Sequence, residues 1–266
     1  MKNKILLTVL SLIISLVFLG SSCGPKPPEP SEDLLPIPLS VTDIDRNKYN
    51  VKRFGKMLWM TENLRVTRYD TESPHYGDTI AVATYQHAVN TDKPYYINAQ
   101  NFEEAPYTDN LTEEIRNSLG LLYNWSAAAG VEQNSNTVKD SIQGICPNGW
   151  RLPRVKDLDS LYKYLDDKET AGTQLKSLYG WHTLTGSGTN ESGLNCYPAG
   201  TAANSFVSLM GQMSLFWTST GQIGNTIRVG ALILSYDQEN AETVYVNKLQ
   251  ANSIRCVMDI TNKYKQ

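Results

Sequence analysis

The apolar and polar positions after residue 40 predict short strands and one clear helix. Alternating side chains at 49–53 precede Gly55-Lys56, which suits a tight turn, and the apolar run Met57-Leu58-Trp59-Met60 follows. This pattern is typical of a β-hairpin. Across residues 154–167, apolar side chains recur at the spacing of one helix face. We therefore expect a helix there, with Pro153 well placed for its first turn.

The rest of the chain alternates between short ordered segments and polar loops. Residues 121–130 read as a strand that runs into an alanine-rich helical turn ended by Gly130. Long loops are expected at 182–192 and 200–212. Further short strands are expected at 194–197, 215–219, 227–236, 243–247 and 253–258. One helix, several antiparallel strands and long loops indicate an α+β fold.

The N-terminal segment has the features of an export signal. Lys2 and Lys4 precede an uncharged apolar run at 5–19, which is shorter than the roughly 20 residues of a comfortable transmembrane helix. Small residues, Gly20-Ser21-Ser22, then stand directly before Cys23. This arrangement resembles the lipobox of bacterial lipoproteins, in which the cysteine is diacylated and becomes the new N-terminus. The alternative is an ordinary secretory signal in which Cys23 is incidental.

These features predict three consecutive parts. Residues 1–22 form a lipoprotein signal peptide, residues 23–40 a lipidated cysteine with a proline-rich tether, and residues 41–266 the folded domain. Six prolines among the 17 residues 24–40 favour extended polyproline II structure, which suits a semi-rigid spacer. We expect anchoring in the outer membrane through the N-terminal lipid. Both the cell surface and the periplasmic face remain open, because no acidic cluster follows Cys23.

Composition narrows the function classes. The chain has 266 residues, a net charge of −3 and 41% hydrophobic residues, which excludes a disordered, collagen-like or multi-span membrane protein. Without a basic run, no nucleic-acid partner is expected. Three histidines and four cysteines leave little material for a metal site, and we expect no metal and no cofactor. No nucleophile elbow, zinc-protease motif or phosphate loop occurs, so we expect no enzyme.

Five sequence blocks carry a family resemblance. They are Lys56-Met57-Leu58-Trp59-Met60-Thr61-Glu62-Asn63-Leu64, Gly120-Leu121-Leu122-Tyr123-Asn124-Trp125-Ser126-Ala127-Ala128, Gly144-Ile145-Cys146-Pro147-Asn148-Gly149-Trp150-Arg151-Leu152-Pro153, Phe216-Trp217-Thr218-Ser219-Thr220 and Ser253-Ile254-Arg255-Cys256-Val257. In this order they resemble the Fibrobacter succinogenes major paralogous domain, over about residues 41–259. That domain occurs in secreted and lipid-anchored proteins, many from Bacteroidetes, and its function is undefined.

A more distant resemblance concerns the fold. The third block stands before a predicted helix, and the fifth block is a predicted last strand. This arrangement is similar to that of the formylglycine-generating enzymes of sulfatase maturation, which have a variant of the C-type lectin fold. The resemblance implies a twisted antiparallel sheet, one main flanking helix, terminal strands side by side and long ligand-bearing loops. It also implies a Cys146–Cys256 disulfide, with Cys196 as a buried thiol. The reactive cysteine pair that holds copper in those enzymes has no counterpart here.

Candidate binding residues lie in the loops. Four of the five tryptophans fall within the blocks, where core packing is expected, so Trp181, followed by His182, is the best candidate for an exposed aromatic platform. Asn190 and Glu191 occupy the loop that would carry calcium ligands in a lectin, but a structural loop is the favoured interpretation. We expect a recognition domain that binds glycan or an envelope protein through loops near 182–192 and 200–214. The alternative is a structural or adhesion subunit.

Overall fold

The structure is a computed structural model that describes residues 38–83, 93–99, 112–131, 141–182, 188–203 and 206–260. These residues belong to one compact unit, Ile37–Gln266. The expected signal peptide, Cys23 and nearly all of the tether lie outside the described residues. Within the described ranges, no helix is both long enough and apolar enough to cross a membrane.

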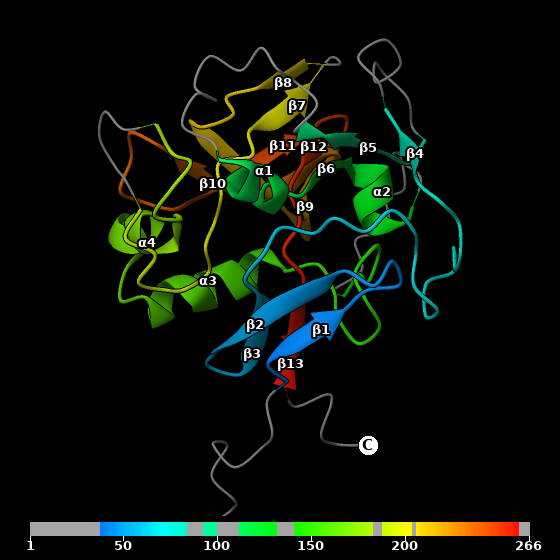
Figure 1. The fold of residues 1–266 in the computed structure, drawn as a ribbon, viewed down its shortest axis with the longest axis horizontal. Helices are drawn as coiled ribbons and strands as arrows, with labels where there is room; N and C mark the ends of the chain where they lie inside the picture. Colours follow the sequence, from blue (N-terminus) through cyan, green and yellow to red (C-terminus); the bar gives the residue numbers. More distant parts are fainter. Residues whose placement is uncertain are drawn as a thin grey trace, which may run out of the picture. The chain divides into compact units, whose positions relative to one another are not determined.

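The first sheet joins the two ends of the domain (Figure 1). Its order is β1-β2-β3-β13, and every pair in it is antiparallel. Its strands are β1 Ser40–Thr42, β2 Lys48–Phe54, β3 Met57–Met60 and β13 Val257–Asp259. The β2–β3 hairpin turns at Gly55, whose φ of 56° suits glycine, and it confirms the predicted hairpin. The last strand therefore lies beside one of the first.

Two further sheets replace the single antiparallel sheet that was expected. One has the order β11-β10-β9, from β9 Met213–Gln222, β10 Asn225–Ser235 and β11 Glu242–Asn247. The other has the order β4-β5-β6-β12-β7-β8, with a parallel β4–β5 pair. Its strands are β4 Ala81–Val82, β5 Tyr95–Asn98, β6 Leu121–Asn124, β12 Ala251–Asn252, β7 Thr201–Ala203 and β8 Phe206–Ser208. Between the described strands of these two sheets there is no ladder: β9 is linked to the chain beside β7 and β12 by the isolated bridges Gly200–Ser214 and Phe216–Ser253.

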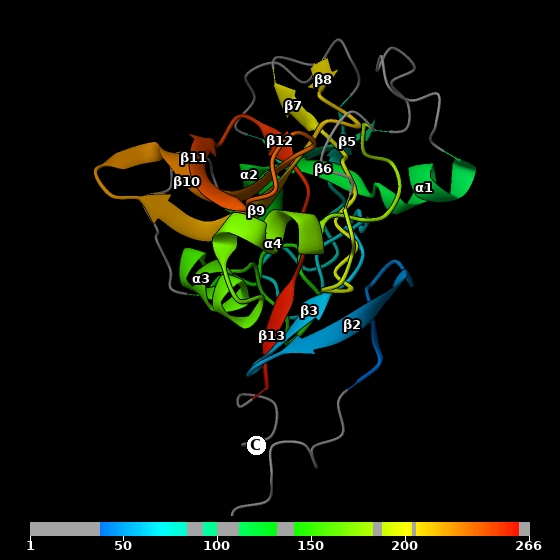
Figure 2. The same cartoon turned by 90° about the vertical axis from the view of Figure 1, so that its left-hand side faces the viewer.

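The described residues form four helices beside the sheets. They are α1 Glu113–Ser118, α2 Trp125–Ala129, α3 Val155–Tyr164 and α4 Lys168–Leu175. The predicted helix is confirmed as α3, which packs against β9 and β10 and beside α4 (Figure 2). The predicted turn of helix ended by Gly130 is α2, and Gly130 has a φ of 64°. The protein is thus mostly β-sheet with few helices, an α+β arrangement.

Several sequence expectations need correction, and one is the strand predicted at 253–258, in which residues 254–256 are not in a strand. The predicted strand at 194–197 is absent, because Asn195 has a φ of 54° and turns the chain, so only Cys196 forms a bridge. The predicted loop at 200–212 instead contains the β7–β8 hairpin. The single main helix has a neighbour, α4, which begins where the Asp167 side chain accepts a hydrogen bond from the Glu169 amide.

The main core lies between α3, α4, the β9–β11 sheet and the first sheet. Leu158 and Leu161 of α3 pack there with Phe216 of β9 and Leu232 of β10. All four block tryptophans are buried, as predicted: Trp59, Trp125, Trp150 and Trp217. A second apolar cluster includes Ile97 and Leu122 of the third sheet.

Candidate binding face

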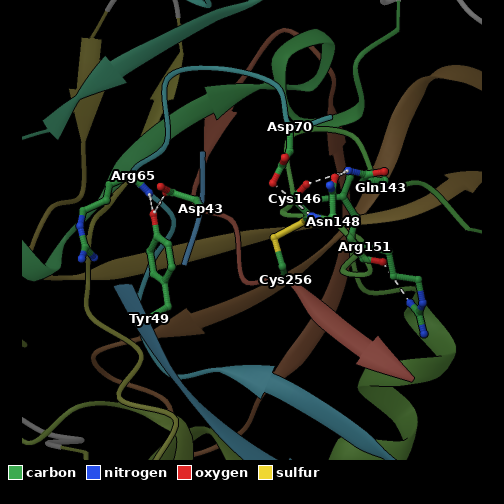
Figure 3. Close-up of a disulfide and its surroundings, with 10 residues drawn as sticks. Asp43, Tyr49, Arg65, Asp70, Gln143, Cys146, Asn148, Arg151 and Cys256 are labelled. Carbon is green, nitrogen blue, oxygen red and sulfur yellow. Dashed lines mark hydrogen bonds between the residues drawn. A yellow bond between two sulfur atoms is a disulfide. The ribbon is translucent and has the colours of Figure 1, made fainter. Parts of the chain in front are cut away.

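Two of the five sequence blocks, the third and the fifth, are joined by a buried disulfide. Cys146 and Cys256 are joined, with Cα atoms 5.9 Å apart, and neither residue is exposed (Figure 3). Beside the bond, the Asn148 amide donates to the Asp70 carboxylate at 3.3 Å, and Gln143 donates to the Asn148 side chain at 3.2 Å. The disulfide and these contacts fasten the loop before α3 to the last strand and to the turn after residue 70.

Arg255 joins three distant segments from inside the protein. Its guanidinium donates to the Asn63 side chain at 2.7 Å, to the Asn195 carbonyl at 2.7 Å and to the Leu194 carbonyl. Asn63 in turn donates to the Leu119 carbonyl at 2.9 Å. Burial lowers the pKa of Arg255. Since its described partners are neutral oxygens, Arg255 acts as a structural donor for backbone that would otherwise lack partners.

A buried ion network connects α3 to the last strand. Arg151 donates to Asp157 at 2.7 Å and to Asp259 at 2.8 Å, while the Arg154 amide donates to Asp157 at 2.7 Å. Burial raises the pKa of Asp157, but hydrogen bonds from Arg154 and Arg151 outweigh it and hold the pKa below its usual value. Asp157 is thus a charge at the helix start, as expected from the sequence, and the network is structural.

Trp181 is buried and does not form the exposed platform that the sequence suggested. It is 7% exposed, and its indole nitrogen donates to the Cys196 carbonyl at 3.1 Å. The ring packs in the main core, and the Lys176 ammonium lies 5.5 Å from its centre. A tryptophan with its polar edge paired inside the protein supports the surface from beneath instead of contacting a ligand.

Residues on either side of Trp181 in the sequence reach the surface. Tyr179 is 67% exposed and Leu178 is 54% exposed, while His182 is half-buried. The His182 ring meets the half-buried Tyr236 ring edge to face, with centres 5.2 Å apart. We call Leu178, Tyr179, His182 and Tyr236 the loop face.

Backbone hydrogen bonds hold the segments of the loop face together. The His182 amide donates to Gly211 and the Tyr236 amide donates to Gln212, each at 2.7 Å. The Ser177 hydroxyl donates to the Tyr179 carbonyl at 2.7 Å. Gly180 then takes a φ of 91°, which lets the chain turn between the exposed Tyr179 and the buried Trp181. The exposed rings therefore stand on a fixed backbone.

Lys176 fixes the turn that carries Tyr236. Its ammonium donates to the carbonyls of Gln238 at 2.7 Å and Ser235 at 3.1 Å, and the residue has no exposed surface. Burial lowers the pKa of Lys176 to about 8, although the negative charges of Asp237 and Glu239 oppose this shift. Lys176 is therefore a support behind the loop face.

The other two predicted binding residues lie in a loop with a structural role. Asn190 has a φ of 51°, and its side-chain oxygen accepts a hydrogen bond from the Asn195 amide at 2.8 Å. Glu191 is exposed. Among the residues that the structure describes, no three His, Cys, Asp or Glu side chains are grouped so that they could hold a metal ion. Asn190 thus shapes the loop, which agrees with the favoured interpretation.

A separate polar cleft lies beside α1. It has a volume of about 680 Å³ and is lined by Glu62, Arg65, Glu113, Glu114, Asn117 and Ser118. Two of these side chains already have partners in the protein, since Glu62 accepts from the Asn50 amide at 2.6 Å and Arg65 donates to the Lys48 carbonyl at 3.0 Å. The cleft lacks the exposed rings of the loop face.

The sequence predicted that Trp181 is the exposed ring, but the structure buries Trp181 and exposes Tyr179. Sequence reasoning selected Trp181 and His182, and the structure brings His182 to Tyr236, which is 54 positions later and was read as the end of a strand. Tyr179 has one local signal, because it stands directly before Gly180 in a segment without regular periodicity. The proximity of His182 and Tyr236 depends on long-range packing and has no signal in the sequence.

Comparison with known families gives one match. The sequence model of the Fibrobacter succinogenes major domain matches residues 53–258, from the end of β2 to within β13. This span is well over half of the 266 residues. No match was found among curated proteins or among solved structures.

Proposed function

Because the chain belongs to the Fibrobacter succinogenes major domain family, we propose that it is an envelope lipoprotein displaying a non-catalytic recognition domain that binds glycan through the loop face. The observation that carries the binding proposal is Tyr179, a mostly exposed ring three positions before His182, whose own ring meets that of Tyr236. Such a ring can stack on the apolar face of a sugar, while nearby polar groups bond to its hydroxyls.

The position of the signature blocks supports a display role. Their side chains form the disulfide, the Arg255 contacts and the Arg151 network, all inside the domain. A scaffold stabilised in this way leaves loops on its surface available for binding. The proposal includes a C-type-lectin-like fold, which is supported by the pairing of β13 with β3 and by α3 beside the sheets.

The anchoring proposal rests on the N-terminal sequence. A signal peptide at 1–22, an acylated Cys23 and a proline-rich tether to residue 40 would hold the domain at the outer membrane, on either face. Metabolic labelling of cells with a palmitate analogue tests it. The native chain should be labelled and fractionate with membranes, whereas Cys23→Ser should be unlabelled. An unlabelled native chain, or a labelled variant, would contradict anchoring through Cys23.

A glycan array probed with the full chain in detergent tests the binding proposal. We expect the native chain to bind glycan and Tyr179→Ala to bind it about tenfold more weakly. A tenfold loss of affinity corresponds to about 1.4 kcal/mol of binding free energy, which is what stacking on one aromatic ring contributes. Tyr76→Ala is the matched control, because Tyr76 is 60% exposed on the turn after Asp70, outside the loop face. Equal binding by native chain and Tyr179→Ala would show that the loop face is not the site.

The alternative, a structural or adhesion subunit, is favoured by a different feature. Ile223 at the tip of the β9–β10 hairpin is 100% exposed, Ile227 is 46% exposed, and the hairpin tip projects from the body (Figure 2). Exposed aliphatic residues at such a tip suit contact with another protein. If Ile223→Asp released the chain from a native envelope complex while Tyr179→Ala did not, the alternative would replace glycan recognition.

A further inference from the structure

We propose that the loop face selects uncharged glycan over polymers of uronic acids. This inference rests on the proposed function and adds the chemical class of the ligand. It follows from the two exposed acidic residues, Asp237 and Glu239, on the turn that carries Tyr236.

Three segments joined by backbone hydrogen bonds carry the loop face, namely residues 177–182, 209–213 and 235–240. Their sequences contain Asp237 and Glu239 but neither arginine nor lysine, and both acidic residues are exposed. Asp237 directly follows Tyr236, so a ligand on the Tyr236 ring would meet a rim of two carboxylates.

The nearest cation by sequence is directed away from a ligand. Lys176 has no exposed surface, and its ammonium donates inward to the Ser235 and Gln238 carbonyls. It holds the backbone of the 235–238 turn, so the carboxylates of Asp237 and Glu239 stay outside. The buried ammonium can reduce the negative potential of the rim, but it cannot bind a ligand carboxylate directly.

This arrangement favours hydroxyl groups over carboxylates on the ligand. Ionised carboxylates only accept hydrogen bonds, and sugar hydroxyls can donate to them. A uronate carboxylate about 4 Å from one acidic side chain would bind about fivefold more weakly, and the effect would fade with added salt. Stacking on Tyr179 would be similar for a neutral sugar and its oxidised form, so the charge alone decides between them.

Affinity electrophoresis of the full chain in detergent tests this selectivity. The gels contain soluble 1,3/1,4-linked β-glucan or 1,4-linked mannan, each beside the same polymer oxidised at C6 to the uronate. We expect a neutral polymer to retard the native chain at least about fivefold more strongly than its oxidised form at low ionic strength. The double variant Asp237→Asn/Glu239→Gln should narrow this ratio, whereas the control Glu72→Gln, an exposed acid outside the loop face, should keep it.

The outcomes separate this inference from the proposed function. If Tyr179→Ala abolishes retardation but oxidised polymers bind as well as neutral ones, the selectivity is wrong and the loop face stands. If retardation is the same in Tyr179→Ala as in the native chain, the loop face itself is wrong. If no polymer retards the folded native chain, glycan as the ligand class is overturned, and palmitate labelling still decides the anchoring proposal.

Discussion

Replacing both cysteines of the Cys146–Cys256 disulfide by alanine is expected to destabilise the domain by several kcal/mol. The bond closes a loop with a sequence separation of 110 between residues that are both fully buried. Without it, the unfolded chain gains conformational freedom, and the loop before α3 loses its covalent link to the last strand.

The expected loss can be worked out from the loop length. For a separation of 110, the chain-entropy relation gives about 4.8 kcal/mol at 25 °C. Removing two buried sulfur atoms adds about 1 kcal/mol for the small voids they leave. Disulfides often contribute less to stability than the entropy relation predicts. We therefore expect the measured free energy of unfolding to fall by about 3 to 5 kcal/mol. Against a total stability of about 5 to 15 kcal/mol for a typical domain, this is a large share.

Urea unfolding followed by tryptophan fluorescence measures this loss. All five tryptophans are buried, so unfolding should change their emission strongly. A Cys23→Ser background avoids pairing through the N-terminal cysteine. The same protein with its disulfide reduced loses the cross-link but keeps both sulfur atoms. Comparing its free energy of unfolding with that of Cys146→Ala/Cys256→Ala therefore separates the effect of the cross-link from the effect of the voids. A loss below about 1 kcal/mol at an unchanged urea slope would refute the entropy argument.

Three further results are expected. Arg255→Met should lower the free energy of unfolding by about 3 kcal/mol in the same urea assay, because it leaves the Asn63 and Asn195 oxygens without their donor, and a loss below about 1 kcal/mol would contradict this role. The pKa of Lys176 is about 8 in the folded protein, whereas its ordinary value is 10.5. Below pH 8 the side chain is therefore protonated in both the folded and the unfolded state, and burying its charge lowers the free energy of unfolding by the full amount. Between pH 8 and 10.5 the folded state binds fewer protons than the unfolded state, so the free energy of unfolding of the native chain should rise with pH relative to that of Lys176→Met. If the difference between the two proteins did not change over this range, the lowered pKa of Lys176 would be contradicted. Calcium and chelator should leave the melting temperature unchanged, because the Asn190 side-chain oxygen is bonded to a backbone amide; calcium stabilisation lost in Glu191→Gln would overturn this expectation.

Local patterns were sufficient for elements whose signals are local. The β2–β3 hairpin follows from alternation and Gly55, and α3 follows from apolar periodicity after Pro153. In contrast, α4 has weak amphipathic character, and its Gly172 is suited to close packing, since a Cβ there would lie 2.0 Å from the Asn240 carbonyl oxygen. A glycine selected by a distant backbone segment lowers the helical signal in the sequence, which explains why this helix was missed.

The candidate site shows the same limit. The sequence predicted an exposed ring near residue 182, but a tyrosine and a tryptophan separated only by Gly180 give no sign of which ring faces inward. In the structure, the Cys196 carbonyl accepts from the Trp181 indole, and the left-handed turn at Gly180 places Tyr179 outside. The disulfide partner of Cys146 was implied by family resemblance, because three cysteines alone allow several pairings.

The most direct test of the central claim is photo-crosslinking of the full chain in intact cells. A benzophenone amino acid is placed in turn at position 179 on the loop face, at position 76 as the exposed control and at position 223 on the hairpin tip. We predict that position 179 forms an adduct and that position 76 forms none. The partner cross-linked at position 179 should resist protease and be degraded by periodate, as a glycan would be. A protease-sensitive adduct from position 223, with no glycan adduct from position 179, would contradict glycan recognition and support an assembly subunit.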